Sequence, residues 1–384
     1  MPPKIVLACA GAGKTQRVAA LALQASRAGK KTLLLTYTEN NQKEIADRLC
    51  LLNNGVFPAN VVVKGWFTFL LEDMIRPYQR SIFSARISGL FFNPSDPHLA
   101  NGRRIGGRQE RVNGSYNHDY FLTRSNNQAH SAYLSRLATI VLEESNRRPI
   151  ARLSAIYKTI LIDEVQDLVG WDYTILEALS SIDGVCCECV GDFRQTIYKT
   201  TPTSRKNPST THQKKQAFIR LGFEQEVMDK SKRCVQPICT FADLVHQRDG
   251  YVQTRSDATI TENFRRHLGV FAVRPADVKE YLLQYKPVIL RWDKRAEPEL
   301  CQNLTAYNFG EAKGSGFDRV LIIPTGDYRT FLSGNLNVFD GNRTETSRNK
   351  LYVAITRARY SVAFLYDGVV GFSSVSTWTP NAHI

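Results

Sequence analysis

The chain has 384 residues, a formal net charge of +14 and 43% hydrophobic residues. This length can supply one large or two ordinary cores, and the basic excess favours a polyanionic partner, although a basic protein without such a partner has the same composition. No apolar run approaches the roughly 18–20 residues of a membrane span, and the first residues lack the pattern of a signal peptide, so we expect a cytoplasmic protein with no membrane partner.

The first predicted elements surround a glycine-rich loop. An apolar run at residues 5–7 leads into "ACAGAGKT" (8–15) and then into an Ala/Leu-rich segment, which predicts a strand, a tight turn and a helix. Backbone N–H groups in such a turn cradle phosphates, a lysine bridges them and a threonine ligates Mg²⁺. A plain glycine turn is the alternative. The residues expected to hold the nucleotide are Gly11, Ala12, Gly13, Lys14 and Thr15, with Thr15 as a magnesium ligand.

A basic segment follows at residues 76–150. Between residues 76 and 148 there are eleven arginines, no lysine and five acidic residues, among many Gly, Asn, Pro and Ser. This composition predicts a loop-rich insertion whose guanidinium groups grip phosphates. The arginines that we expect to contact nucleic acid are Arg103, Arg104 and Arg108.

Two buried strands further along the chain end in polar residues. "TILIDEVQD" (159–167) places Asp163 and Glu164 at the carboxyl end of a strand, the edge where the glycine-rich loop also lies in a parallel sheet. Asp163 can hold Mg²⁺ while Glu164 polarises the attacking water. "VCCECVGDFRQTIY" (185–198) predicts a second such strand, in which Gln195 can sense the γ-phosphate and the cysteines are reduced core thiols.

The order of these segments resembles that of the UvrD/Rep-like helicases of superfamily 1. Further segments similar to family motifs are "TYTENNQKEIADRL" (36–49), "GWFTFLL" (65–71), "KSKRC" (230–234), "NFGEAKGSGFDRVLII" (308–323) and "KLYVAITRAR" (350–359). The resemblance implies an α/β fold of two RecA-like P-loop NTPase domains with parallel sheets, ATP and Mg²⁺ between them, and a small basic insertion in the first.

The resemblance also implies roles for individual residues. Arg233 and Arg357 would contact the γ-phosphate, with Arg357 as an arginine finger. Trp66 and Phe67 offer ring faces on which bases could stack, with plain core packing as the alternative. The residues that would contact single-stranded nucleic acid through these motifs are Thr36, Tyr37, Thr38, Trp66, Phe67, Tyr198 and Lys313.

Several positions depart from the family pattern. Only four residues precede the first strand, where the family has an adenine-reading glutamine, and Lys232 replaces an aromatic residue that stacks on the base. Arg17 is then the expected adenine contact, with a relaxed nucleotide preference. The family's Trp-Arg-Gly is replaced at residues 199–201, and its motif His and Glu by Gly310 and Gly316. These changes affect coupling to nucleic acid more than hydrolysis.

A second accessory domain of the family has no room in this chain. Only about seventy residues separate Arg233 from Asn308, and their pattern predicts motor-domain elements. These are helices at 237–247 and 275–285 and strands at 269–273 and 287–292. We therefore expect a minimal motor that translocates on single strands and unwinds poorly alone.

The expected organisation is a first motor domain at 1–75 and 151–205, the basic insertion at 76–150, a linker at 206–225 and a second motor domain at 226–384. Three functions stay open. The first is an ATP-dependent translocase or helicase on single-stranded DNA, favoured over RNA, with 3′ to 5′ polarity implied by the resemblance. The second is a nucleic-acid-gated ATPase, a switch or sensor beside a protein partner such as a nuclease in antiphage or mobile-element biology. The third, a small-molecule kinase or nucleotide-binding protein, needs only the glycine-rich loop.

Overall fold

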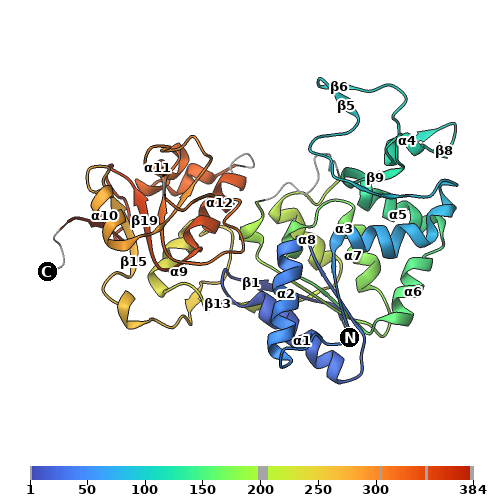
Figure 1. Ribbon diagram of the computed structural model, residues 1–384, viewed down its shortest axis with the longest axis horizontal. Helices are drawn as coiled ribbons and strands as arrows, with labels where there is room; N and C mark the ends of the chain where they lie inside the picture. The colour runs from blue at the N-terminus through green and yellow to red at the C-terminus, as the bar shows by residue number, and fades with distance from the viewer. Residues whose placement is uncertain (1, 198–205, 303, 342–344, 381–384) are drawn as a thin grey trace. The chain divides into compact units, whose positions relative to one another are not determined.

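The computed structural model describes residues 2–197, 206–302, 304–341 and 345–380. The chain divides into two compact units. Unit 1 consists of Met1–Val6, Lys14–Gly191 and Lys199–Glu226, and unit 2 of Leu7–Gly13, Asp192–Tyr198 and Val227–Ile384. Each unit is built on its own six-stranded sheet (Figure 1). The domain limits expected from the sequence remain a proposal.

The first sheet carries the glycine-rich loop and the acidic strand end. Its strand order is β12 (Glu224–Met228), β1 (Lys4–Ala8), β11 (Cys186–Gly191), β10 (Thr159–Ile162), β2 (Thr32–Thr36) and β3 (Val61–Gly65). Every residue of β2 and β10 is buried, as expected for parallel strands covered on both faces. β10 pairs in parallel with β2 and β11, so the residues that follow these strands emerge at one edge.

Helices of unit 1 connect these strands. α1 (Lys14–Arg27) buries Val18, Ala19, Ala22 and Leu23, one stripe at helical spacing. α2 (Glu39–Leu52) begins at Thr38, whose side chain accepts a hydrogen bond from the Asn41 N–H at 3.2 Å. The others are α3 (Trp66–Phe69), α5 (Leu134–Glu144), α6 (Arg148–Ile156), α7 (Asp172–Ser180) and α8 (Thr211–Arg220).

Residues 89–130 of the basic segment form short strands, turns and one short helix, whereas its last part contains the helix α5 and the start of α6. β4 (Gly89–Phe91) pairs in parallel with β9 (Gln128–His130), and α4 (His118–Phe121) lies between them in the chain. Two hairpins, β5–β6 (Leu99–Ala100, Arg103–Arg104) and β7–β8 (Arg111–Val112, Ser115–Tyr116), each close through an Asn-Gly pair with positive φ at both residues. Asn-Gly favours this turn because both residues adopt the left-handed region at low cost. The first turn brings Arg103 and Arg104 onto an exposed ribbon.

The second sheet has the order β17 (Ala306–Asn308), β16 (Val288–Arg291), β18 (Phe317–Ile322), β19 (Ala358–Leu365), β15 (Gly269–Val273) and β20 (Val375–Trp378), and all its pairings are parallel. Alternate side chains enter two cores. One contains residues of α9 (Gln236–Leu244), α11 (Gly326–Leu332) and α12 (Glu345–Ile355), and the other residues of α10 (Val278–Tyr285). The helices and strands expected between residues 237 and 292 are confirmed, and so is the α/β class with two parallel sheets.

None of the eight cysteines forms a disulfide, and six of them are buried. Cys187 and Cys189 lie on β11 and are 2% and 0% exposed. They are therefore core thiols, as their apolar context predicts. Within the described ranges, no helix is both long and apolar enough to cross a membrane.

Candidate nucleotide site and nucleic-acid surface

The glycine-rich loop joins β1 to α1. Gly11 and Gly13 have φ values of +75° and +88°, which side chains rarely adopt. A Cβ atom on Gly11 would lie 2.6 Å from the Arg233 Cβ and 2.8 Å from the Ser231 Oγ. Hydrogen bonds also join the loop to the segment at residues 230–234. Lys232 N donates to Gly11 O at 2.9 Å, and Ser231 Oγ donates to Ala10 O at 2.8 Å. Within unit 2, the "KSKRC" segment therefore packs directly on this loop.

Gly11→Ala is expected to cost stability in two ways, through the positive φ and through the clash with Arg233. Gly29 is the matched control because its φ is +71° and a Cβ there meets nothing within 4 Å. Gly29→Ala should lower the free energy of unfolding by about 1 kcal/mol. Gly11→Ala should lower it by about 1–3 kcal/mol more, since the loop must shift. Urea unfolding of both variants measures the difference, and equal losses would mean that the close approach carries no cost.

The acidic turn after β10 lies at the carboxyl edge of the first sheet. Asp163 N donates to Leu35 O at 2.8 Å, which continues the pairing with β2. Glu164 adopts a left-handed conformation with φ 54°, and its N–H donates to the Asp163 carboxylate at 2.9 Å. Such a conformation is strained for a glutamate, and it turns the two carboxylates out of the strand direction. The Lys14 ammonium lies 3.7 Å from the Glu164 carboxylate, so the phosphate-loop lysine and the acidic turn meet.

Burial shapes the charge of this cluster. Asp163 is 2% exposed. Burial, and to a smaller degree the neighbouring Glu164 carboxylate, raises the pKa of Asp163 to about 7. A divalent cation beside this carboxyl would favour its charged form, so the pair fits a magnesium site.

Two contacts fix the backbone of the acidic turn. The Lys214 ammonium of α8 is fully buried and donates to Gln166 O at 2.6 Å. A Cβ atom on Gly191, at the end of β11, would lie 2.5 Å from the Gln166 Oε1 and 2.9 Å from the Val165 Cγ1, so a side chain there would displace these neighbours. Gln166 also donates to the Glu164 carboxylate through its amide. The turn is therefore held in place by the adjacent strand and by α8.

A buried polar network in unit 2 connects the glycine-rich loop with the segments "GDFRQ" and "KLYVAITRAR". Tyr352 Oη accepts from Ala10 N and donates to the Asp192 carboxylate, both at 3.2 Å. Gln195 Nε2 donates to the same Asp192 carboxylate at 2.8 Å, and Gln195 Oε1 accepts from the Arg357 guanidinium at 3.3 Å. This chain of contacts brings together Gln195 and Arg357, which the sequence assigns to the γ-phosphate from distant segments.

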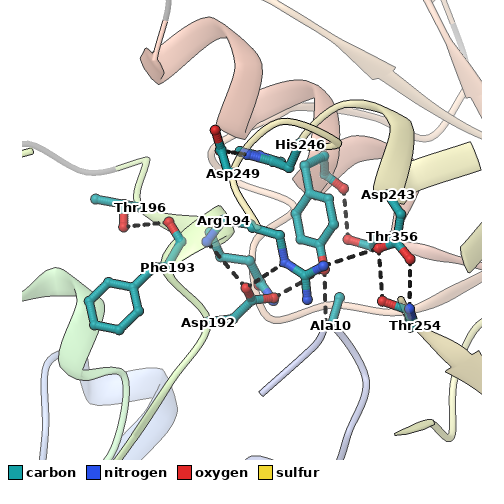
Figure 2. A network of polar contacts seen from close by, with 12 residues as sticks. Ala10, Asp192, Phe193, Arg194, Thr196, Asp243, His246, Asp249, Thr254 and Thr356 are labelled. Carbon is teal, nitrogen blue, oxygen red and sulfur yellow. Dashed lines mark hydrogen bonds and ion pairs between the residues drawn. The ribbon is translucent and has the colours of Figure 1, made fainter. Parts of the chain in front are cut away.

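Arg194 occupies the centre of the network in Figure 2. Its side chain is 3% exposed and forms ion pairs with Asp192 and with Asp243 of α9, both at 3.1 Å. The guanidinium also lies over the rings of Tyr352 and Tyr251, 4.6 and 4.8 Å from their centroids. Arg194 thus ties the segment after β11 to α9 and α12.

Arg357 is 1% exposed, and each of its three guanidinium nitrogens donates a hydrogen bond within its own unit. Its guanidinium donates to Val353 O and Ser315 O, both at 3.1 Å, besides Gln195. Arg233 is half-buried and donates to Thr356 O at 3.3 Å. Arg233 therefore contacts the backbone carbonyl of the residue that directly precedes Arg357.

Arg17, the expected adenine contact, is held by acidic residues of unit 1. Its guanidinium pairs with Glu188 of β11 at 2.7 Å and with both carboxylate oxygens of Glu226 in β12, at 2.5 and 2.8 Å. An adenine could reach Arg17 only if it shares or opens these ion pairs, and the assignment remains a prediction. Thr15 is half-buried at the start of α1.

The candidates for nucleic-acid contact fall into different environments. Tyr37 and Phe67 are partly exposed, with ring centroids 5.3 Å apart. Trp66 is 1% exposed and donates to the buried Asp172 carboxylate at 2.7 Å. For Trp66 the structure therefore supports the core-packing alternative, since a base cannot reach a ring that protein covers. Thr36 is buried at the end of β2, and Thr38 caps α2.

The cationic candidates are more accessible. Arg103 and Arg104 are exposed on β6, Lys313 is half-buried, and Arg108 is half-buried with one guanidinium N–H donating to Pro97 O at 3.1 Å. Tyr198 lies outside the described residues.

Sequence reasoning missed Tyr352 and Arg194. Tyr352 lies in the same motif as Arg357, and Arg194 lies in the same motif as Gln195. In each motif the functional role was assigned to the second residue only. Their helical or turn positions gave no signal, because the partners that bury them, Ala10 and Asp243, are distant in the chain.

Among solved structures, the chain is similar to an arterivirus nonstructural protein 10, a helicase, determined in complex with DNA, at 13% sequence identity and a TM-score of 0.43. The similarity covers 95% of this chain, which spans 60% of that helicase. The curated proteins contain no match. The family model AAA_19, described as an AAA domain, matches residues 2–201, more than half of the chain and the part that contains the glycine-rich loop and the acidic turn. The chain therefore belongs to the AAA_19 family of AAA domains.

Proposed function

We propose that this protein hydrolyses ATP with Mg²⁺ and couples hydrolysis to movement on single-stranded nucleic acid, as a UvrD/Rep-like translocase or helicase of superfamily 1. The observation that carries the proposal is the ion pair between Lys14 and Glu164 beside the buried Asp163 carboxyl. A lysine at the start of a helix after a glycine turn, close to two carboxylates, is the donor set that Mg-ATP and an attacking water require.

Four residues of unit 1 have a part in this reaction. Lys14 bridges the phosphates, and Thr15 and Asp163 hold Mg²⁺, whose charge offsets that of the phosphate oxygens. Glu164 orients the attacking water and accepts its proton. Two protein oxygens suffice, because Mg²⁺ is held largely by phosphate and water. Among the described residues, no group of three or more His, Cys, Asp or Glu side chains could hold a metal ion.

Residues of unit 2 supply the remaining groups. Gln195 senses the γ-phosphate, and Arg233 and Arg357 stabilise its charge in the transition state. Loss of the γ-phosphate then releases these contacts, and alternation between the two states moves the strand. We retain Tyr37, Phe67, Arg103 and Arg104 as strand contacts, favour DNA over RNA, and infer 3′ to 5′ movement from the resemblance. A cytoplasmic location is proposed from the reduced core thiols.

The burial of Arg357 favours a second candidate function, a nucleic-acid-gated ATPase that serves as a switch or sensor in a larger complex. An arginine committed to Val353, Ser315 and Gln195 must exchange these partners before it can act on ATP. Binding of a strand, or of a protein such as a nuclease, would then set the rate of hydrolysis.

The test is the steady-state rate of Mg²⁺-dependent ATP hydrolysis without nucleic acid and with single-stranded DNA, duplex DNA or single-stranded RNA. We expect strong stimulation by single-stranded DNA. Equal rates in all four reactions would contradict the coupled motor, and absence of hydrolysis in all four would contradict the ATPase. Strand displacement by the stimulated protein separates a helicase from a gated switch.

A further inference from the structure

An aromatic row in unit 1 extends beyond the residues that the sequence motifs assign. Phe67 lies 5.3 Å from Tyr37 and 5.9 Å from Phe92, measured between ring centroids, and both contacts are edge-to-face. The three rings come from separate segments: Tyr37 follows β2, Phe67 belongs to α3 and Phe92 follows β4 in the basic insertion. The insertion therefore adds a ring to the pair already considered for strand binding.

Phe92 presents its ring to solvent. It is 67% exposed. Its contact with Phe67 is edge-to-face at an interplanar angle of 76°, so Phe67 covers at most one face of the Phe92 ring. A single exposed phenylalanine needs no explanation by itself, but this ring continues a row and stands in a segment that exposes further apolar side chains, namely Phe91, Leu99, Ile105 and Val112.

The charge of the insertion indicates what covers this ring. Residues 76–148 contain eleven arginines and five acidic residues, so the segment that carries Phe92 has a strong excess of positive charge. Proteins that hold single strands combine a cationic track with aromatic faces, because every base has a π-face and every nucleotide has a phosphate. A purely apolar protein partner would gain nothing from the guanidinium groups.

We propose that Phe92 is a stacking platform for a base of a single-stranded nucleic acid, which continues the row from Tyr37 and Phe67 into the insertion. The proposal rests on the proposed function, since it requires that a single strand binds. The base lies on the face of Phe92 that Phe67 does not cover, and the arginines of β6 hold the adjoining backbone.

Phe91 is a matched control for this proposal. It precedes Phe92 directly, is 43% exposed and packs its ring on His130, with centroids 6.0 Å apart. Since successive side chains of an extended segment point to opposite sides, Phe91→Ala removes a similar apolar surface away from the row.

The first experiment is the equilibrium binding of a fluorescent oligothymidine strand to the full chain. Phe92→Ala should weaken binding roughly 5- to 150-fold, the usual range for one base stacked on an aromatic ring. Phe92→Leu should weaken it similarly because it keeps the bulk and loses the π-face, whereas Phe92→Trp should bind as tightly as the wild type. Phe91→Ala should bind nearly as tightly as the wild type.

Salt and an abasic strand identify the kind of contact. Phe92→Ala should leave the slope of log affinity against log salt unchanged, whereas Arg103→Gln, Arg104→Gln and Arg108→Gln together should reduce it by about 2. On a strand with abasic residues, wild type and Phe92→Ala should bind alike, because no base is there to stack.

Four outcomes would overturn the proposal. They are equal binding by Phe92→Ala and Phe91→Ala, full binding by Phe92→Leu, an undiminished effect of Phe92→Ala on the abasic strand, and thermal unfolding of Phe92→Ala well below the wild type. Each of these leaves the proposed function standing. Failure of the wild type to bind any strand would instead refute the proposed function together with this inference.

Discussion

The Glu164→Gln variant is expected to bind Mg-ATP and to hydrolyse it about 10²- to 10⁴-fold more slowly than the wild type. The reason is that glutamine keeps the size and hydrogen-bonding reach of Glu164 but cannot accept the proton of the attacking water. The left-handed backbone at this position is no harder for glutamine than for glutamate, so the turn should persist. Single-turnover hydrolysis and equilibrium binding of ATP measure the two effects separately.

Lys14→Ala provides the contrast. It removes the ammonium that pairs with Glu164 at 3.7 Å, and with it the group proposed to bridge the phosphates. We therefore expect loss of hydrolysis together with weaker ATP binding. If Glu164→Gln lost ATP binding as completely as Lys14→Ala, Glu164 would have a role in holding the nucleotide. If it turned over ATP at the wild-type rate, another group would be the base.

The elements around the nucleotide site could be predicted because their signals are local. The loop needs glycines at Gly11 and Gly13 and a helix start at Lys14, and the acidic turn needs a buried strand just before Asp163. Both signals lie within about ten residues. The parallel sheet then brings the two strand ends to one edge, a general property of such sheets.

Residues whose role depends on distant partners could not be predicted in the same way. Trp66 looked like a stacking face, but Asp172 of α7 accepts its indole N–H and buries it. Arg17 looked available for adenine, but Glu188 and Glu226 hold it. Each partner lies more than a hundred residues away, so only the folded chain shows which contact wins.

Replacement of Arg357 by alanine is expected to slow ATP hydrolysis by about 10³-fold or more, if this residue acts as an arginine finger. A finger stabilises charge that develops on the γ-phosphate in the transition state, so kcat should fall far more than the affinity for ATP. Measurement of kcat together with the ATP dissociation constant shows which of the two changes.

A structural role must be separated from this effect, because Arg357 is buried. Its removal leaves the acceptor oxygens of Val353, Ser315 and Gln195 without this donor, at about 1–3 kcal/mol for each buried group left unsatisfied. Partial unfolding lowers the fraction of active protein, which thermal unfolding of the same sample detects. A variant that is folded at the assay temperature therefore isolates the catalytic loss.

Arg359→Ala is the matched control. Arg359 stands two residues further on, is 53% exposed and pairs only loosely with Asp318, at 3.7 Å. Arg359→Ala removes the same charge from the start of β19 (Ala358–Leu365), directly after the turn that holds Arg357, without touching the buried network, so hydrolysis should stay close to the wild-type rate. Arg357→Lys should recover little activity, because an ammonium cannot reproduce the forked contacts of a guanidinium. Equal rates for Arg357→Ala and Arg359→Ala would mean that Arg357 never leaves its buried partners, and the gated ATPase would then need another group at the γ-phosphate.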